Sequence, residues 1–385
     1  MILIEMMCDL CDFTLLLQST PSLIISLFGL LVTGKLLENV VETTGMQKFP
    51  ILLQSNCILN FKGNVELLYA LYLSSLRQND CVTYEKYLRY VFDNGNLVLL
   101  QSITIGITIG IIGIARSILV GIFELKLLTT ILTTSLVTCT ITTLIFILLL
   151  YLTIEFSKWM SISPDNVILP TLGSLSDFLS IRFLILFTDY FKHFSIYILS
   201  LTILSCLCII PFCIFFVCAS KKRMPIQSVS ILAFTYILST FGGYILDKMS
   251  IKYTFVASSF PVYSGLAVSI SFIYLHKIFT SVSNRTEHNS KLSYLTLIIT
   301  SFLMIVFYIL LSSIFDLKRS LMFYALFILF FIFQVMLLLK LIEMLAKFLQ
   351  CYDGDIGIIS LPIVTAVGDV TSTTLLMLLA NIKDN

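Results

Sequence analysis

The chain has 385 residues, of which 58% are hydrophobic and only 12% are charged, and its mean hydropathy is +1.01. Soluble domains carry about 25% charged residues, so this composition excludes a soluble fold and indicates an all-α polytopic membrane protein in a lipid bilayer. The formal net charge is only +2, which gives no reason to expect nucleic acid as a partner.

Apolar stretches of about 20 residues predict transmembrane helices. We expect eleven of them, at residues 21–41, 51–76, 97–121, 127–152, 166–188, 194–218, 227–247, 253–280, 293–315, 320–347 and 358–381. Residues 1–20 precede the first span and lack the basic start of a secretory signal. The linkers between the spans are too short to form a folded soluble domain.

The spans divide into two blocks of five with one span between them. We expect a first repeat at residues 21–190, a linking helix with a basic loop at 191–224, and a second repeat at 225–385. Because five is odd, two directly joined blocks would face opposite ways across the membrane, and the linking helix makes them parallel. Their interface is then the expected position of a transport site.

Two aspartates at matched places in the two blocks are the strongest functional signal. Asp177 follows Pro170 by seven residues, and Asp369 follows Pro362 by seven residues. An ionised carboxylate in hydrocarbon costs roughly 2.5–3.5 kcal/mol on insertion scales, so we expect a cation between the two. The alternative is that both aspartates only tie helices together by hydrogen bonds.

Further aspartates stand where the same two helices begin. Asp165 precedes Asp177 by about 18 Å of helical rise, and Asp353 and Asp355 stand at the corresponding place before Asp369. They could gather cations at one mouth of a pathway. Helix capping, in which Asp accepts from the first N–H groups, is the competing interpretation and is compatible with the first.

The second span carries an unusual polar run, Lys62-Gly-Asn64-Val-Glu66. Asn64 offers a carbonyl oxygen suited to a hard cation or to its waters, and Gly63 would allow close backbone approach. Interhelical hydrogen bonding is the alternative for Asn64 and Glu66. Lys62 and Glu66 stand four residues apart and could neutralise one another.

The charged residues outside these runs bear on orientation. Arg116 lies toward a span end, where an arginine is expected to reach the interface. A modest excess of Lys and Arg in the loops on the N-terminal side predicts a cytoplasmic N-terminus, and we expect the plasma membrane.

At this point the motifs resemble those of a known family, the solute carrier family 41 magnesium transporters, which are relatives of MgtE. Phe61-Lys-Gly-Asn-Val-Glu66 resembles the "LKGNLE" of that family, and the segment from Pro164 to Asp177 is similar to its "PDNVxxPxxxSLGD". The second-repeat motifs "ISSxGGLILD" and "PYLTALGD" resemble Ile237–Asp247 and Pro362–Asp369. The resemblance covers nearly the whole chain from about residue 21.

The resemblance implies a transporter of divalent cations, most simply Mg²⁺ as the transported ion, with no organic cofactor and no enzymatic activity. It places Asp177 and Asp369 at the central cation site and matches Asn64 to the Asn of "KGN". Asp165, Asp353, Asp355, Glu66 and Ser269 complete the expected set of metal-site residues. A homo-oligomer or a membrane partner is left open.

The chain departs from the family in its second repeat. The family's "PVINGIGGN" reads Pro261–Ser269 here, so Ser269 replaces the Asn, and Ala267 and Val268 replace the two glycines. These changes raise the alternative of a transport-impaired homologue that acts with a partner.

An intramembrane aspartyl protease is a rival from another class, because Tyr352-Asp353 and Gly368-Asp369 echo its motifs. Those two aspartates lie roughly 24 Å apart along one helix, so they cannot share a proton, and Asp177 with Asp369 would have to form the dyad instead.

Overall fold

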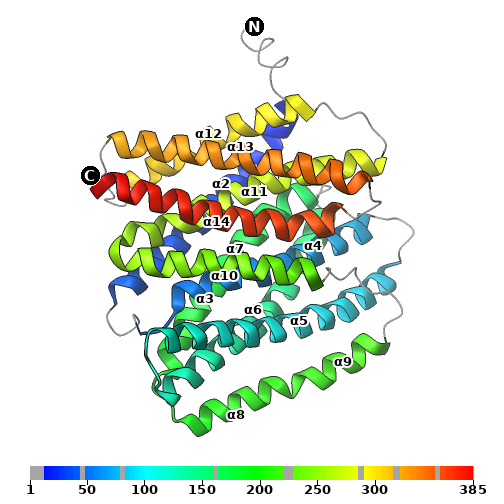
Figure 1. The fold of residues 1–385 in the computed structure, drawn as a ribbon. Helices are drawn as coiled ribbons and strands as arrows, with labels where there is room; N and C mark the ends of the chain where they lie inside the picture. The colour runs from blue at the N-terminus through cyan, green and yellow to red at the C-terminus, as the bar shows by residue number, and fades with distance from the viewer. Residues whose placement is uncertain are drawn as a thin grey trace, which may run out of the picture.

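The protein folds as a bundle of long helices, seen here in a computed structural model (Figure 1). The structure describes residues 13–43, 48–78, 83–159, 164–219, 229–284, 290–314, 321–351 and 356–384. The helices are α2 (Phe13–Glu42), α3 (Ile51–Cys57), the π-helix η1 (Ile58–Lys62), α4 (Gly63–Gln78), α5 (Tyr84–Leu119), α6 (Leu125–Trp159), α7 (Pro164–Phe191), α8 (Ile196–Leu207), α9 (Ile209–Ala219), α10 (Val229–Lys252), α11 (Thr254–Asn284), α12 (Ser290–Ile314), α13 (Leu321–Cys351) and α14 (Ile356–Asp384).

The all-helical expectation is confirmed for the described residues. When α3, η1 and α4 are counted as one rod and α8 and α9 as another, these residues form eleven helices. Nine helices within them are long and apolar enough to cross a membrane. The described residues of the expected spans 51–76 and 227–247 are helical, but these spans are not among the nine. The first of them is divided into α3, η1 and α4, each of which is shorter than a membrane span.

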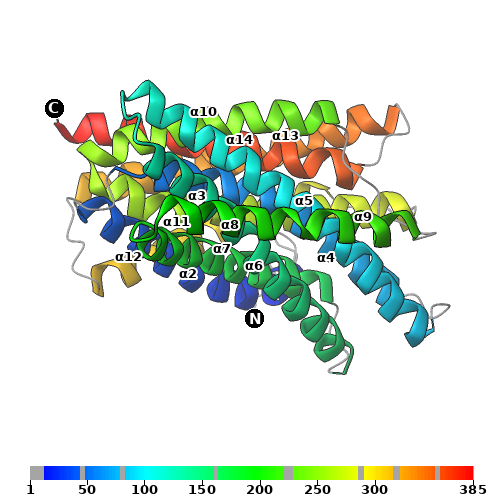
Figure 2. The same cartoon turned by 90° about the horizontal axis from the view of Figure 1, so that it is seen from below.

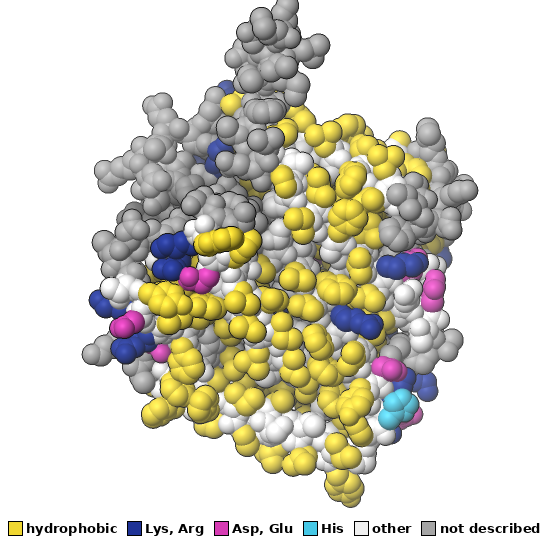
Figure 3. All heavy atoms as spheres, turned by 180° about the vertical axis from the view of Figure 1, so that it is seen from behind, with side chains coloured by type: hydrophobic (Ala, Val, Ile, Leu, Met, Phe, Trp, Pro, Cys, Tyr) yellow, Lys and Arg dark blue, Asp and Glu magenta, His cyan; other side chains and the backbone are white. Residues whose placement is uncertain are grey.

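The surface agrees with a multi-pass membrane protein. Figure 3 shows a broad field of hydrophobic side chains in the middle of one face, with most of the charged side chains at its two sides, where the helices end. Large apolar residues such as Leu201, Phe215, Ile237 and Leu329 are well exposed. In a bilayer these side chains contact lipid, so their exposure carries no penalty.

Two large hydrophobic cores form most of the interior, and three smaller clusters accompany them. One joins α11, α12, α13 and α14 with the first half of α2, and its fully buried members include Tyr263, Phe331 and Leu338. The other lies among α3 to α7 and includes Tyr69 and Phe146. The kinked rod of α8 and α9 lies outside both bundles along one edge, against α6 and α5 (Figures 1 and 2).

The first helix of each block packs across the interface. Helix α2 lies against α7 and also against α11 of the other block, while α10 lies against α14 and also against α3. Gly34 permits the first crossing, because a Cβ there would be 2.0 Å from the Ser258 carbonyl oxygen. Gly243 permits the second, where a Cβ would be 2.9 Å from Leu53 Cδ1. Small residues thus let the backbones approach closely.

Local sequence explains several element boundaries. Gly121 has φ +87, and the Gly121 and Ile122 N–H groups bond to the Ile118 and Ser117 carbonyls, which ends α5 with the left-handed cap that glycine favours. Pro362 lies within α14 without ending it. A proline can loosen the start of a helix, but Pro362 does not interrupt α14. The irregular backbone occurs instead in η1.

Candidate functional site

A polar cavity lies between the two blocks, near the middle of the bundle. Its walls come from α2, η1, α4, α6, α7, α11 and α14. The centres of water molecules can occupy about 80 Å³ of it, and a single water needs only about 10–15 Å³. The polar side chains that line it are Ser26, Thr33, Asn60, Asn64, Glu66, Ser174, Ser176, Asp177, Ser264, Ser269, Thr365 and Asp369. The cavity therefore presents polar groups among apolar ones and is large enough for several waters.

Asp369 of α14 is held in this cavity by two neutral donors. Asn60 Nδ2 donates to Asp369 Oδ2 at 2.8 Å, and Ser264 Oγ donates to Oδ1 at 2.6 Å. The two donors come from η1 and α11, so the carboxylate is the meeting point of three helices. Hydrogen bonds to a charged acceptor are stronger than neutral ones, and they fix the orientation of Asp369 without neutralising it.

The carbonyl oxygens of two asparagines lie beside Asp369. Asn64 Nδ2 donates to Asn60 Oδ1 at 2.9 Å, and the Thr365 hydroxyl lies 3.0 Å from Asn64 Oδ1 and 3.2 Å from Asn60 Oδ1. Asn60 and Asn64 stand four residues apart on one helix face. This chain of amides and a hydroxyl connects η1 and α4 to α14.

Asp177 of α7 lines the same cavity but differs from Asp369 in its hydrogen bonding. It is half-buried, and among the described residues it has no hydrogen-bond donor. It interacts electrostatically with Lys62, Glu66 and Asp369. Both of its oxygens are therefore free to accept hydrogen bonds from water or to approach a cation.

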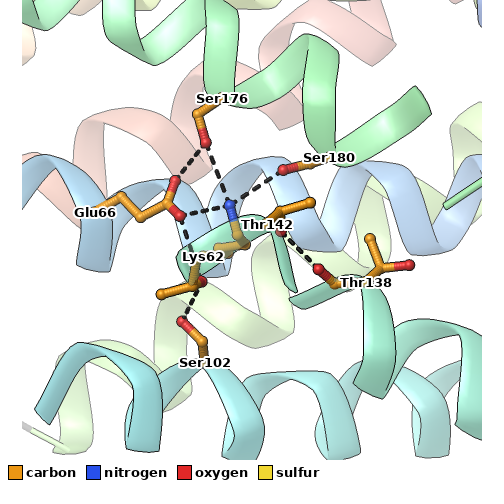
Figure 4. Close-up of polar contacts among 8 residues, drawn as sticks. Lys62, Glu66, Ser102, Thr138, Thr142, Ser176 and Ser180 are labelled. Carbon is orange, nitrogen blue, oxygen red and sulfur yellow. Dashed lines mark hydrogen bonds and ion pairs between the residues drawn. The ribbon is translucent and has the colours of Figure 1, made fainter. Parts of the chain in front are cut away.

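Lys62 and Glu66, which interact electrostatically with Asp177, form a buried ion pair with each other (Figure 4). Lys62 Nζ is 2.5 Å from Glu66 Oε1, and both side chains are almost completely buried. Lys62 also donates to Ser176 Oγ at 3.2 Å and Ser180 Oγ at 3.1 Å, while Ser176 donates to Glu66 Oε2 at 2.5 Å. The predicted neutralisation of Lys62 by Glu66 is confirmed. It also fastens α4 to α7.

The π-helix η1 explains how one short segment contacts both α14 and α7. In η1 the hydrogen bonds skip an extra residue, which rotates the side chains relative to a regular α-helix. Within this turn Asn60 reaches Asp369 on α14, and Lys62 reaches Ser176 and Ser180 on α7. Gly63 follows directly, and a Cβ there would meet nothing within 4 Å. The expected close backbone approach at Gly63 is therefore wrong, since this glycine borders the open cavity.

The structure brings five of the expected site residues together, because Asn64, Glu66, Asp177, Ser269 and Asp369 all line the cavity. The other three expectations concern the mouth. Asp165 lies within α7, but its side chain is outside the described part of the structure. Asp353 and Asp355 lie wholly outside the described residues.

Sequence reasoning did not identify Asn60, Ser264 or Ser26. The Ser26 hydroxyl is buried at the cavity and has no hydrogen-bond partner among the described residues. A signal for Asn60 was present, since it stands four residues before Asn64 on a regular helix face. No comparable signal marked the two serines, because serine is common in apolar helices.

The expectation for Arg116 is wrong. Its side chain does not reach outward but is buried, with Nη2 2.6 Å and Nε 2.9 Å from Asp247 Oδ2. This ion pair joins α5 to α10 and lies outside the cavity lining.

Comparison with known proteins now bears on this geometry. Residues 55–187 match the family model named MgtE, described as a divalent cation transporter. This region is therefore similar to a family of divalent cation transporters. The matched range contains Asn60, Asn64, Glu66 and Asp177, while Asp369 lies beyond it.

The chain is also a distant homologue of solute carrier family 41 member 3 from Rattus norvegicus. The two are 24% identical over 364 residues, which covers 83% of this chain and 77% of the relative. No solved structure matches the chain significantly. Both similarities are to transporters, which favours transport over the aspartyl protease interpretation.

The lining of the cavity suits a hydrated cation. Within the described ranges there is no group of three His, Cys, Asp or Glu residues that could ligate a metal ion directly. The cavity offers instead carboxylates, amide oxygens and hydroxyls around a space for water. Because Lys62 and Glu66 cancel, the uncompensated charge comes from Asp177 and Asp369, which matches one divalent ion.

Proposed function

We propose that the protein transports Mg²⁺ across the membrane along a pathway between its two blocks, with Asp177 and Asp369 at the centre. The single observation that carries this proposal is that both carboxylates, 192 positions apart in the sequence, line one cavity that has room for several waters. The MgtE match at residues 55–187 supports a divalent cation as the transported species.

The donor set favours Mg²⁺ held through its waters. Mg²⁺ prefers octahedral oxygen coordination and loses water reluctantly. Asp177 has no competing hydrogen bond from the described residues, and Asp369 is fixed by Asn60 and Ser264. Asn64 and Ser269 offer further oxygens at the cavity wall. Waters bound to the ion would donate to these oxygens.

The two blocks act in this proposal as repeats, residues 21–190 and 225–385, joined by the helix and basic loop of residues 191–224. Support comes from the reciprocal packing of α2 on α11 and of α10 on α3. The close approaches at Gly34 and Gly243 have the same relation in the two blocks. A transport site at the interface of two repeats is common among secondary transporters.

The entrance and the driving force follow from charge. Asp165, Asp353 and Asp355 would concentrate cations at the mouth beside the start of α7 and α14. With a cytoplasmic N-terminus in the plasma membrane, the membrane potential would favour entry by about 2.3 kcal/mol per charge per 100 mV, which is doubled for a divalent ion.

The test is a flux assay with purified protein in proteoliposomes. Asp177→Asn and Asp369→Asn each remove one carboxylate charge and keep the shape of the side chain. We expect Mg²⁺ uptake to fall at least about ten-fold in each variant and to background in the double variant, because the cation loses its counter-charges. Undiminished uptake by the double variant would contradict the proposal.

A second candidate function is a transport-impaired partner of an active protein. Val268 and Ser269 line the cavity where the family carries Gly and Asn, and a Cβ on Gly368 would be only 2.8 Å from Val268 Cγ2. A bulky valine at this position narrows the cavity. If wild-type protein binds Mg²⁺ in the flux assay but never passes it, this candidate replaces the first.

A further inference from the structure

The protein contains a fixed cation of its own beside the proposed site. Lys62 is 1% exposed and is absent from the cavity wall, whereas its partners Glu66 and Ser176 line the cavity. The ammonium therefore lies behind the wall and contacts it through the Glu66 carboxylate and the Ser176 hydroxyl (Figure 4).

The ammonium is held in place by all three of its donors. A lysine side chain has three N–H groups, and Lys62 Nζ has three acceptors at 3.2 Å or less: Glu66 Oε1, Ser176 Oγ and Ser180 Oγ. Its positive charge is thus held in one place behind the wall, because all three N–H groups have acceptors there.

The second block contains no counterpart of this pair. When Asn64 is aligned with Ser269, as the motifs direct, Lys62 corresponds to Ala267 and Glu66 to Ser271. Ala267 is fully buried in the hydrophobic core, and the Ser271 hydroxyl bonds to the Ala267 carbonyl of its own helix. The duplicated architecture does not require an ion pair at this place, so the pair has a role specific to the first block.

We propose that Lys62 is a specificity-determining residue that sets the charge of the transport site at two. It cancels Glu66, which is the third carboxylate on the cavity wall, and leaves Asp177 and Asp369 for the ion. A divalent cation then neutralises the site completely, whereas a monovalent cation leaves one buried charge unpaired. This inference rests on the proposed function and deepens it by assigning the origin of valence selectivity.

The proposal predicts shifts of opposite sign for the two members of the pair. Glu66→Gln leaves Lys62 uncompensated and reduces the site to one net negative charge. We expect the half-saturating Mg²⁺ concentration to rise more than about ten-fold, and Na⁺ to compete more effectively against Mg²⁺ than in wild type. Lys62→Met leaves three carboxylates. We expect the half-saturating concentration to fall and the maximal rate to fall with it, because the ion leaves slowly.

The decisive variant is the double substitution Lys62→Met with Glu66→Gln. It removes both charges, so the site again carries two, and we expect the half-saturating concentration and the Mg²⁺/Na⁺ preference to return to within about three-fold of wild type. Lys62→Arg keeps the charge and should preserve the preference as well. If one single variant does not fold, the other single and the double variant still give the comparison.

The matched control is a second buried ion pair among the described residues, Arg116 with Asp247, which does not line the cavity. The double substitution Arg116→Met with Asp247→Asn should leave the Mg²⁺/Na⁺ preference unchanged. If the Lys62/Glu66 double variant is as impaired as the singles, or if both singles shift in the same direction, the pair is only structural and the inference is overturned. A wild-type protein that passes no divalent cation would overturn the proposed function and this inference together.

Discussion

Asn60 is a neutral side chain that orients the carboxylate of Asp369 in the cavity. Its Nδ2 donates to Asp369 at 2.8 Å, and its own Oδ1 accepts from Asn64, so one amide holds two residues of the cavity wall. Asn60→Ala removes the donor and leaves Asp369 with Ser264 alone. A hydrogen bond to a charged group contributes about 1.5–3 kcal/mol. We therefore expect the half-saturating Mg²⁺ concentration to rise on the order of ten-fold.

Thr371→Ala is the control for this prediction. Thr371 is on the same helix as Asp369, but its hydroxyl bonds only to the Val367 and Gly368 carbonyls of its own backbone. Its loss should change Mg²⁺ uptake by less than two-fold. Equal uptake by the Asn60→Ala variant and wild type would show that Asn60 is not needed to orient Asp369.

The residues that could be predicted were those whose chemistry conflicts with a membrane. Asp177 and Asp369 were found because an ionised carboxylate in an apolar stretch is energetically costly and therefore indicates a functional site. Ser264 and Ser26 escaped notice because a serine in an apolar helix can bond to its own backbone. Arg116 was misinterpreted because its partner Asp247 is 131 positions away. Its pairing depends on how α5 meets α10, which no local pattern reveals.

At the scale of elements, the helical glycines Gly34 and Gly63 differ in how closely other atoms approach them. A Cβ at Gly34 would be 2.0 Å from the Ser258 carbonyl oxygen, so Gly34→Ala must push α2 away from α11. Forced overpacking of this kind costs about 1–3 kcal/mol. We expect the variant to lose monomeric protein at a lower temperature than wild type when detergent samples are heated and analysed by size-exclusion chromatography.

Gly63 supplies the contrast within the same measurement. A Cβ at Gly63 would meet nothing within 4 Å, and alanine favours a helix by about 1 kcal/mol over glycine. Gly63→Ala should therefore match or exceed wild type in thermal stability. Gly63→Leu should also fold but should reduce Mg²⁺ uptake, because its side chain extends into the cavity. If Gly63→Ala lowered the thermal stability as much as Gly34→Ala, the open surroundings given to Gly63 would be contradicted.

The element boundaries could be predicted only in part. Apolar length located the described helices within a few residues in most cases, since hydrocarbon thickness fixes how much apolar chain is needed. The division of residues 51–78 into α3, η1 and α4 was not predicted. A π-turn adds one residue to the helical register at positions that are set by tertiary contacts, and the run from Ile58 to Lys62 has no proline or glycine to mark it.

At the scale of the whole molecule, two separate cores meet around a polar interior. Each core is apolar and belongs mainly to one block, but α2 contributes to both. Helix α10 packs on α3, and its Tyr236 ring stacks on Phe61 of η1 with the ring centroids 3.8 Å apart. The cavity lies where neither core closes. This arrangement lets apolar packing hold the bundle together while the carboxylates remain available to an ion.

The Arg116–Asp247 pair joins the two blocks outside the cavity, and its removal tests how they are held together. Arg116→Met leaves Asp247 as a buried charge without its partner. Breaking a buried pair in this way costs about 3–5 kcal/mol, whereas replacing both members with neutral groups is often close to neutral. We expect Arg116→Met to lower the thermal stability of the detergent-solubilised protein strongly, and the further substitution Asp247→Asn to restore most of it.

The same pair distinguishes stability from transport. Because neither residue lines the cavity, the restored double variant should transport Mg²⁺ with the half-saturating concentration of wild type. If the double variant is stable but its half-saturating concentration changes by more than about ten-fold, then α5 and α10 move relative to one another during transport, and the ion pair belongs to that motion. Equal losses in the single and double variants would show that the guanidinium contributes by packing and not by charge.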